Sequence, residues 1–254
     1  MKTVFALGCH PDDIEFTMAG VLFLLKAKGC RIHYMNIANG SCGTTALSRK
    51  EITGIRRQEA MTAAKILGAD FHGSLCNDIE VYYEDKLIRK VAAVVREIRP
   101  DIMFVPSPVD YMEDHVNTGR IGVTAAFVRG MRNYDTIPKR PPFPADVVLY
   151  HALPYGLKDG LGNTVRPKIF VDIAVVMEKK SEMLAAHKSQ KEWLDKSQGL
   201  DSYVSTMKDM AGAVGKMSGK FELAEGFTRH SHLGFSAGED DPLTDLLKEN
   251  VLAV

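Results

Sequence analysis

The chain has 254 residues, of which 45% are hydrophobic and 25% are charged. These values are ordinary for a globular protein and allow one large domain with a sizeable core. Lys and Arg number 32, and Asp and Glu also number 32, so the formal net charge is zero. A balanced charge gives no electrostatic reason to expect a nucleic-acid or anionic-membrane partner. No run reaches the roughly 18 apolar residues that a spanning helix requires, so we expect no membrane span.

Strand-like and helix-like segments alternate along the first half of the chain. Short β-branched or aromatic runs predict strands at residues 2–7, 31–38, 69–75 and 101–108. Helical spacing predicts helices at residues 15–29, 48–68, 84–100 and 114–130. Ser48, followed three residues later by Glu51, forms a capping box for the second helix. This alternation predicts right-handed βαβ units and a parallel sheet, so residues 1–130 should form a doubly wound α/β core.

The second half of the chain is less regular. Residues 135–146 are proline-rich and predict a surface loop, and residues 147–156 and 168–174 predict two more strands. Residues 175–194 have helical spacing, whereas residues 215–243 show no clear pattern. We expect a single domain over residues 1–254, with residues 131–254 adding strands, a helix and a helical or irregular appendage to a three-layer α/β/α core with a mostly parallel sheet.

The cysteines and the N-terminus bear on the compartment. The four cysteines are Cys9, Cys30, Cys42 and Cys76. No two of them form a CxxC motif, and the N-terminus lacks the pattern of a secretory signal peptide. We therefore expect reduced thiols and a cytoplasmic location. A ligand role for Cys9 stays open, although alternation along a strand predicts that Cys9 and His10 face opposite sides.

A cluster of chemically active side chains follows the first predicted strand. The stretch "ALGCHPDDIE" places His10, Asp12 and Asp13 at its carboxyl end, and "DYMEDHVNTG" places His115 after the fourth predicted strand. Ligands of open α/β sheets bind at the carboxyl ends of strands where the strand order reverses, and strands 1 and 4 flank that reversal. Two imidazoles and one carboxylate are typical of a catalytic zinc site, and Fe(II) is the alternative metal.

The two adjacent carboxylates, Asp12 and Asp13, can have different roles. His10 and Asp13 are three residues apart on a strand-to-helix turn and can converge on one ion, while the neighbouring carboxylate stays available as a base. The alternative is that one of the two aspartates only caps the helix that follows. The pairing with His115 favours the metal site. The stretch contains one glycine where a dinucleotide-binding fingerprint needs three.

Five motifs together resemble the LmbE-like (PIG-L) zinc-dependent N-deacetylases. They are "ALGCHPDDIE", "NGSCGT", "RRQEAMTAAKILG", "DYMEDHVNTGR" and "AAHKSQ", and they span nearly the whole chain in the family's order. The resemblance implies a Rossmann-like fold, removal of acetyl groups from N-acetylglucosamine conjugates or related amides, and a trimeric or hexameric homo-oligomer. It makes His10, Asp13 and His115 the metal ligands and Asp12 the general base.

The resemblance also suggests roles around the metal. It points to Arg56 as a substrate contact, with Arg57 as an equally available alternative, and the loop that begins at Asn39 could contact a sugar or a phosphate. Asp114 could orient His115 or His10 as an acceptor of a ring N–H. The alternative for the arginines and the loop is an ordinary solvated surface.

The second motif departs from the family pattern. Typical members read Asp-Tyr-His-Pro-Asp-His, whereas this chain has Met112 in place of the first histidine. A thioether cannot donate a proton, so Asp12 returns the proton itself or another residue replaces the histidine. His187 is our first choice, and the other candidates are His151, His230 and His232. Met is apolar and adaptable, so Met112 beside the metal suggests a substrate other than the family's usual thiol-precursor glucosaminide.

These observations predict a zinc-dependent N-deacetylase for a small N-acetyl sugar or glycoconjugate. Water attacks the acetyl carbonyl, Asp12 takes the proton, and His187 is the candidate proton donor. Two alternatives stay open. One is a metal-dependent hydrolase of another amide or of a phosphoester, which would need a second ion for two-metal chemistry. The other is a non-catalytic α/β domain that binds a sugar or nucleotide. A carboxylate left free beside the metal argues against it, because binding alone needs no general base.

Overall fold

The computed structural model of the protein describes residues 1–191 and 203–254. In this part of the chain eight strands form one sheet in the order β3-β2-β1-β4-β5-β7-β6-β8. The strands are β1 (Thr3–Gly8), β2 (Arg31–Asn36), β3 (Asp70–His72), β4 (Ile102–Val105), β5 (Val148–Ala152), β6 (Ile169–Asp172), β7 (Ala224–Arg229) and β8 (Val251–Ala253).

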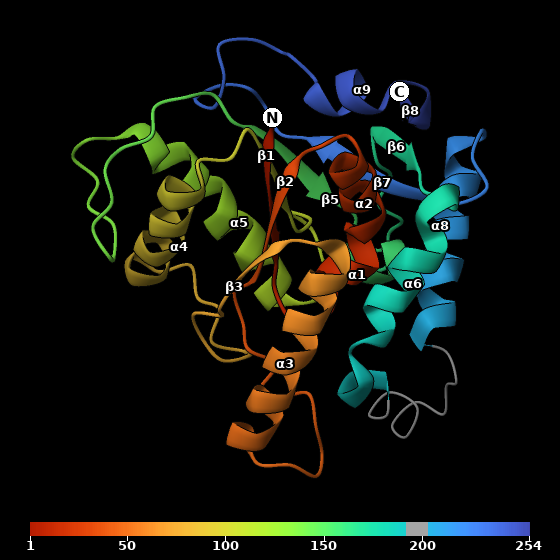
Figure 1. The fold of residues 1–254 in the computed structure, drawn as a ribbon, viewed down its shortest axis with the longest axis horizontal. Helices are drawn as coiled ribbons and strands as arrows, with labels where there is room; N and C mark the ends of the chain where they lie inside the picture. The colour runs from red at the N-terminus through yellow and green to blue at the C-terminus, as the bar shows by residue number, and fades with distance from the viewer. Residues whose placement is uncertain (192–202) are drawn as a thin grey trace.

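Helices cover both faces of this sheet. The α-helices are α1 (Asp13–Thr17), α2 (Ala19–Ala27), α3 (Arg49–Leu67), α4 (Asp85–Ile98), α5 (Glu113–Phe127), α6 (Met177–Ala185), α8 (Tyr203–Ser218) and α9 (Pro242–Leu247). Short 3₁₀ turns are η1 (Val128–Gly130), η2 (Tyr155–Leu157), η3 (Ala174–Val176) and η4 (Lys248–Asn250). In Figure 1, α4 and α5 lie to the left of the first strands, and α2, α6 and α8 lie to the right. No helix in the described ranges is both long and apolar enough to cross a bilayer.

The strand pairing places the predicted reversal of strand order between β1 and β4. Strand β1 pairs in parallel with β2 on one side and with β4 on the other. Strands β2 and β3 and strands β4 and β5 are also parallel, whereas β7 is antiparallel to both neighbours and β8 is antiparallel to β6. The α/β prediction is confirmed. The sheet is mixed: the four pairs among β1 to β5 are parallel, as predicted, and the three pairs at the C-terminal edge are antiparallel.

The alternation of side chains along β1 divides the core into two parts. Val4 and Ala6 belong to a buried cluster with residues of α2, α3, α6 and α8. Phe5 and Leu7 belong to a second cluster with residues of α4 and α5. Both faces of the strand are fully buried, as expected for a central parallel strand with helices on either side. The strand is therefore a rigid support for whatever follows its carboxyl end.

The helix predicted over residues 15–29 is two helices in the structure. Helix α1 ends at Thr17, and Met18, with φ −135° and ψ −19°, separates it from α2. The buried carboxylate of Glu225 accepts hydrogen bonds from the backbone N–H groups of Gly20 and Val21, both at 2.8 Å. A carboxylate at this position satisfies the free N–H groups of the first turn of α2. This long-range cap explains a break that no local signal in the sequence marks.

The C-terminal half differs most from the prediction. The helix predicted over residues 175–194 begins at Met177 and is interrupted after Ala185, and residues 192–194 lie outside the described residues. Helix α8, strand β7, helix α9 and strand β8 follow, and none of these elements was predicted from the sequence. Strands β7 and β8 join the same sheet as β1.

Candidate active site

The conformation of the turn after β1 depends on the Asp13 carboxylate and on a glycine, Gly8. The Asp13 carboxylate oxygen Oδ2 accepts hydrogen bonds from the backbone N–H of His10 at 2.8 Å and of Cys9 at 3.2 Å. A Cβ on Gly8, the last residue of β1, would lie 2.4 Å from Asn36 Oδ1. Only glycine therefore lets the chain pass this close to β2. These contacts fold His10 and Asp13 toward each other at the carboxyl edge of the sheet.

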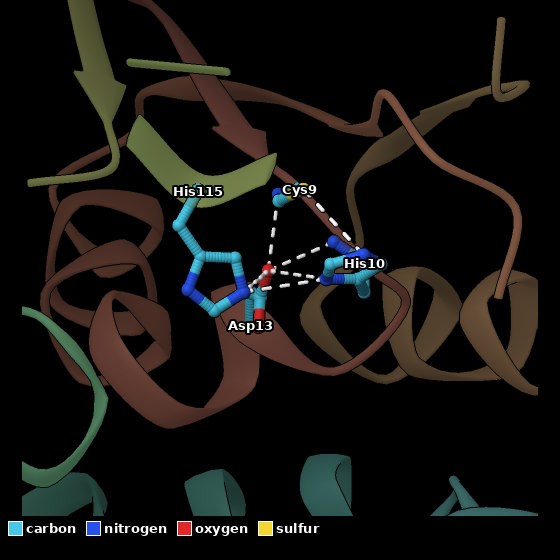
Figure 2. Close-up of side chains that lie close together, drawn as sticks. All are labelled: Cys9, His10, Asp13 and His115. Carbon is cyan, nitrogen blue, oxygen red and sulfur yellow. Dashed lines mark hydrogen bonds and ion pairs between the residues drawn. The ribbon is translucent and has the colours of Figure 1, made fainter. Parts of the chain in front are cut away.

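Three donor atoms from two distant segments converge at this edge. His115 Nε2, from the first turn of α5, lies 3.3 Å from His10 Nδ1 and 3.3 Å from Asp13 Oδ2. His10 Nδ1 lies 3.7 Å from Asp13 Oδ2. Figure 2 shows the Asp13 carboxylate between the two imidazoles. Donors bound to a tetrahedral ion at about 2.0–2.1 Å lie roughly 3.3–3.4 Å apart, so this donor set fits a divalent metal ion.

Two further carboxylates hold the imidazoles in place. His10 Nε2, the ring nitrogen away from the donor set, lies 3.1 Å from Asp114 Oδ2, and His115 Nδ1 lies 3.1 Å from Asp110 Oδ1. A carboxylate that accepts the second ring N–H fixes the tautomer and orientation of a metal-binding histidine. Asp114 was predicted to orient one of the histidines, and its partner is His10. No role was predicted for Asp110, whose contact forms only once the loop before α5 has folded.

The charges of the cluster favour ligation by Asp13. Burial raises the pKa of Asp13, but the imidazoles of His115 and His10 outweigh this effect and hold the pKa well below its ordinary value. Asp13 is therefore ionised at neutral pH. An ionised carboxylate with two imidazoles is a hard and borderline donor set that suits zinc or iron.

Cys9 also lies close to the cluster, contrary to the prediction that it faces away from His10. Its Sγ is 3.8 Å from His10 Nε2, and it belongs to the group of possible metal-holding side chains with His10, Asp13 and His115. The alternation fails because β1 ends at Gly8, before either residue. The sulfur approaches the ring nitrogen that faces Asp114 rather than the nitrogen of the donor set. Burial also raises the pKa of Cys9 to about 11, which keeps the thiol protonated.

Asp12 lies next to the donor set but has different partners. Its backbone has φ 124° and ψ −21°, a conformation that few residues other than glycine adopt. Its Oδ2 accepts a hydrogen bond of 2.6 Å from the Tyr203 hydroxyl, and its Oδ1 lies 3.4 Å from Arg56 Nη2. Arg56 also donates to the backbone carbonyl of Pro11. Burial raises the pKa of Asp12 more than the Arg56 charge lowers it.

A cavity of about 490 Å³ opens onto these groups. This volume is in the range of pockets for small molecules. The wall combines aromatic rings with a few polar groups: its lining includes Phe16, Tyr111, Tyr155, Tyr203, Arg56, Asp78 and Gln190. Rings of this kind present an apolar face with a polar edge, which suits a ligand that has both. The donor set, Asp12 and the cavity thus form one continuous site.

Known proteins resemble this chain over most of its length. A family model described as PIG-L, GlcNAc-PI de-N-acetylase, matches residues 5–126. The diacetylchitobiose deacetylase of Thermococcus kodakarensis is 30% identical over 199 residues, which cover 75% of this chain and 70% of that protein. The chain belongs to the PIG-L family.

Other known proteins extend the comparison. The structure of N,N'-diacetylchitobiose deacetylase from Pyrococcus horikoshii superposes with a TM-score of 0.76 at 25% identity, covering 95% of this chain and 88% of that one. The 4-oxalmesaconate hydratase of Pseudomonas putida is 24% identical over 190 residues, 70% of each protein. The PIG-L model ends before β5, so it covers the donor set and Asp12 but not Tyr203.

The structure separates the predicted substrate contacts. Arg56 and Met112 line the cavity, whereas Arg57 is exposed and does not line it. Asn39 does not line it: its amide donates to Asn77 Oδ1 at 2.9 Å, and its oxygen accepts from the N–H of Ser41 at 3.1 Å. The same loop reaches the cavity instead through Cys42 and Gly43.

The four histidines considered as replacements for the family histidine all lie elsewhere. His187 is fully buried with Nε2 3.0 Å from the Glu15 carboxylate, and it does not line the cavity. A proton donor has to reach the leaving group, so we do not carry His187 into the mechanism. His151 and His230 contact each other at 2.9 Å beside a separate cavity, and His232 lies 3.5 Å from Glu239. In the described residues, the histidines that line the site are His10 and His115.

Proposed function

We propose that this PIG-L family protein is a metal-dependent N-deacetylase of small N-acetylated sugars. The observation that carries the proposal is the arrangement of three converging donors beside a carboxylate, Asp12, that is absent from the cluster of possible ligands. The proposal treats the fold as Rossmann-like, because the site lies where the order of the parallel strands reverses. The deacetylase relative at 30% identity supports the same reaction.

We assign the metal to His10 Nδ1, Asp13 Oδ2 and His115 Nε2, and we favour zinc, with Fe(II) as the alternative. A divalent ion bound there supplies Lewis acidity, which lowers the pKa of a water toward 7 and polarises a carbonyl. Asp110 and Asp114 hold the two imidazoles in the tautomer that leaves these nitrogens free to bind.

The other residues handle the proton and the substrate. Asp12 accepts the proton of the attacking water, and its carboxylate is fixed by the ion pair with Arg56 at 3.4 Å and by the hydrogen bond from Tyr203. The aromatic wall and Met112 contact the apolar face of the sugar and its acetyl methyl group. Cleavage of the amide releases acetate and a free amino sugar.

Incubation with N-acetylglucosamine and N,N'-diacetylchitobiose is expected to release acetate and free amine in equal amounts. Dialysis against a chelator should abolish this release, and zinc should restore it, because the proposed reaction depends on a metal ion to activate the water. Acetate and amine are measured by an enzyme-coupled assay and by fluorescamine labelling.

The competing reaction is tested with 4-oxalmesaconate, because one relative is a 4-oxalmesaconate hydratase. Hydration of that acid, with no acetate released from any N-acetyl sugar, would overturn the proposal.

A Gly40→Ala substitution is expected to disturb Arg56 without touching the donor set. Gly40 has φ +78°, and a Cβ there would lie 2.4 Å from Arg56 Cδ. We expect the free energy of unfolding to fall by about 1–2 kcal/mol and kcat/KM to fall by about 10–100-fold, since Arg56 moves away from Asp12. Chemical denaturation and steady-state kinetics measure the two effects.

The control for this variant is Gly54→Ala on α3, where an added Cβ meets open space. It should stabilise the helix by up to about 1 kcal/mol and leave kcat/KM unchanged. Equal kinetics for Gly40→Ala and Gly54→Ala would show that Arg56 has no role at Asp12.

We also propose a cytoplasmic location and a homo-oligomer. All four cysteines are free, which is typical of proteins from reducing compartments. The trimer or hexamer expected for this family is tested by light scattering on the purified protein.

A further inference from the structure

The Tyr203 hydroxyl is placed where it can pass a proton. Tyr203 is the first residue of α8, and its side chain crosses to the turn after β1 and donates to Asp12 Oδ2 at 2.6 Å. This short distance is typical of a hydroxyl bound to an ionised carboxylate. The residue is 2% exposed, and its ring packs edge-on against Phe16 with 5.2 Å between centroids. Tyr203 nevertheless lines the cavity together with Asp12, so the hydrogen-bonded pair borders the space where a substrate would bind.

The reaction proposed above needs such a group. Amide cleavage requires a proton on the leaving nitrogen, and Met112 replaces the family residue that would supply it. Among the described residues that line the cavity, the histidines are His10 and His115, and both are candidate metal ligands. Two other cavity tyrosines, Tyr111 and Tyr155, show ring contacts but no hydrogen bond to Asp12 in the described chain. Of these three tyrosines, Tyr203 is the one whose hydroxyl is hydrogen-bonded to the proposed base.

We propose that Tyr203 relays the proton from Asp12 to the leaving amine, an inference that rests on the proposed deacetylase function. Asp12 takes one proton from the attacking water. When the C–N bond breaks, the Tyr203 hydroxyl gives its proton to the nitrogen and at the same time receives the proton held by Asp12. The net change is one proton moved from water to amine. Asp12 ends ionised and Tyr203 ends protonated, ready for the next turnover.

The environment of Tyr203 supports a relay in which no free phenolate accumulates. Burial and the Asp12 charge raise the pKa of Tyr203 well above its ordinary value. The hydroxyl therefore stays protonated at neutral pH and must regain a proton as it gives one away. Arg56 lies 3.4 Å from the other oxygen of Asp12 and holds the carboxylate in the orientation that the relay requires, between the attacking water and Tyr203.

A Tyr203→Phe variant tests the relay with two substrates whose leaving groups differ. N-acetylglucosamine leaves as an amine that must be protonated, whereas 4-nitrophenyl acetate leaves as a stable phenolate that needs no proton. We expect kcat to fall by about 100-fold for the amide and by less than about threefold for the ester. The ring contact with Phe16 is retained, so zinc content and melting temperature should match the wild type. Tyr83→Phe, whose hydroxyl bonds to Thr124 outside this site, is the matched control.

The outcomes separate the relay from the function on which it rests. Equal losses on amide and ester mean that Tyr203 only positions Asp12, and this result overturns the relay. No loss on either substrate overturns it as well. A wild-type protein that releases no acetate from N-acetyl sugars contradicts the proposed function and the relay with it.

Discussion

Replacing Asp12 with asparagine is expected to lower kcat for acetate release by about 10³-fold while zinc remains bound. Asp12 is the carboxylate beside the donor set that Arg56 and Tyr203 hold and that does not belong to the cluster of possible ligands. An amide cannot accept the proton of the attacking water. Steady-state kinetics and atomic-absorption analysis of the same preparation measure the two quantities.

Asparagine is the right substitution because of the Asp12 backbone. Its φ of 124° is uncommon for a side-chain-bearing residue, and asparagine and aspartate tolerate positive φ better than alanine does. Asparagine also keeps an oxygen that can accept the Tyr203 hydroxyl. A loss of activity in Asp12→Asn with unchanged melting temperature therefore reports on the base alone. A kcat within about tenfold of the wild type would assign the base to another residue.

The proximity of the candidate metal ligands could be predicted from the sequence because these residues follow regular elements. His10 and Asp13 come directly after a strand with a strong apolar pattern, and His115 opens the helix after the fourth strand. Parallel strands place their carboxyl ends at one edge, so adjacent β1 and β4 bring these residues together. The donor distances near 3.3 Å agree with that expectation.

Residues that act over long distances in the sequence could not be predicted in this way. Tyr203 meets Asp12 across 191 positions, and Glu225 caps α2 across more than 200. Neither residue carries a local signal, because each contact depends on how α8 and β7 are placed against the N-terminal part of the fold. The structure was also needed to see that Arg56, and not Arg57, is buried and lines the cavity. The burial of His187 has the same origin: the position of a motif in the sequence does not reveal that the ring contacts Glu15.

Replacing His115 with alanine is expected to abolish stoichiometric zinc binding, the largest effect on the metal that the structure supports. His115 supplies one of three donors and the only one from outside the β1 turn in the described cluster. Two remaining donors cannot complete a catalytic zinc site, which normally has three protein ligands. Metal content after gel filtration, compared with about one ion per chain in the wild type, measures the loss.

The variants Asp114→Asn and Cys9→Ala test whether the metal has ligands other than His10, Asp13 and His115. Asp114 holds His10 Nε2 at 3.1 Å but is not a proposed ligand, so Asp114→Asn should keep the metal with a Kd raised by about 10–100-fold. Cys9 approaches the same Nε2 side of the ring, 3.8 Å away, so Cys9→Ala should leave the Kd unchanged. Loss of zinc in Cys9→Ala would make the thiol a fourth ligand and close the position that water needs. Retention of zinc in Cys9→Ala together with its loss in His115→Ala would leave the three-donor site with one position open for catalysis.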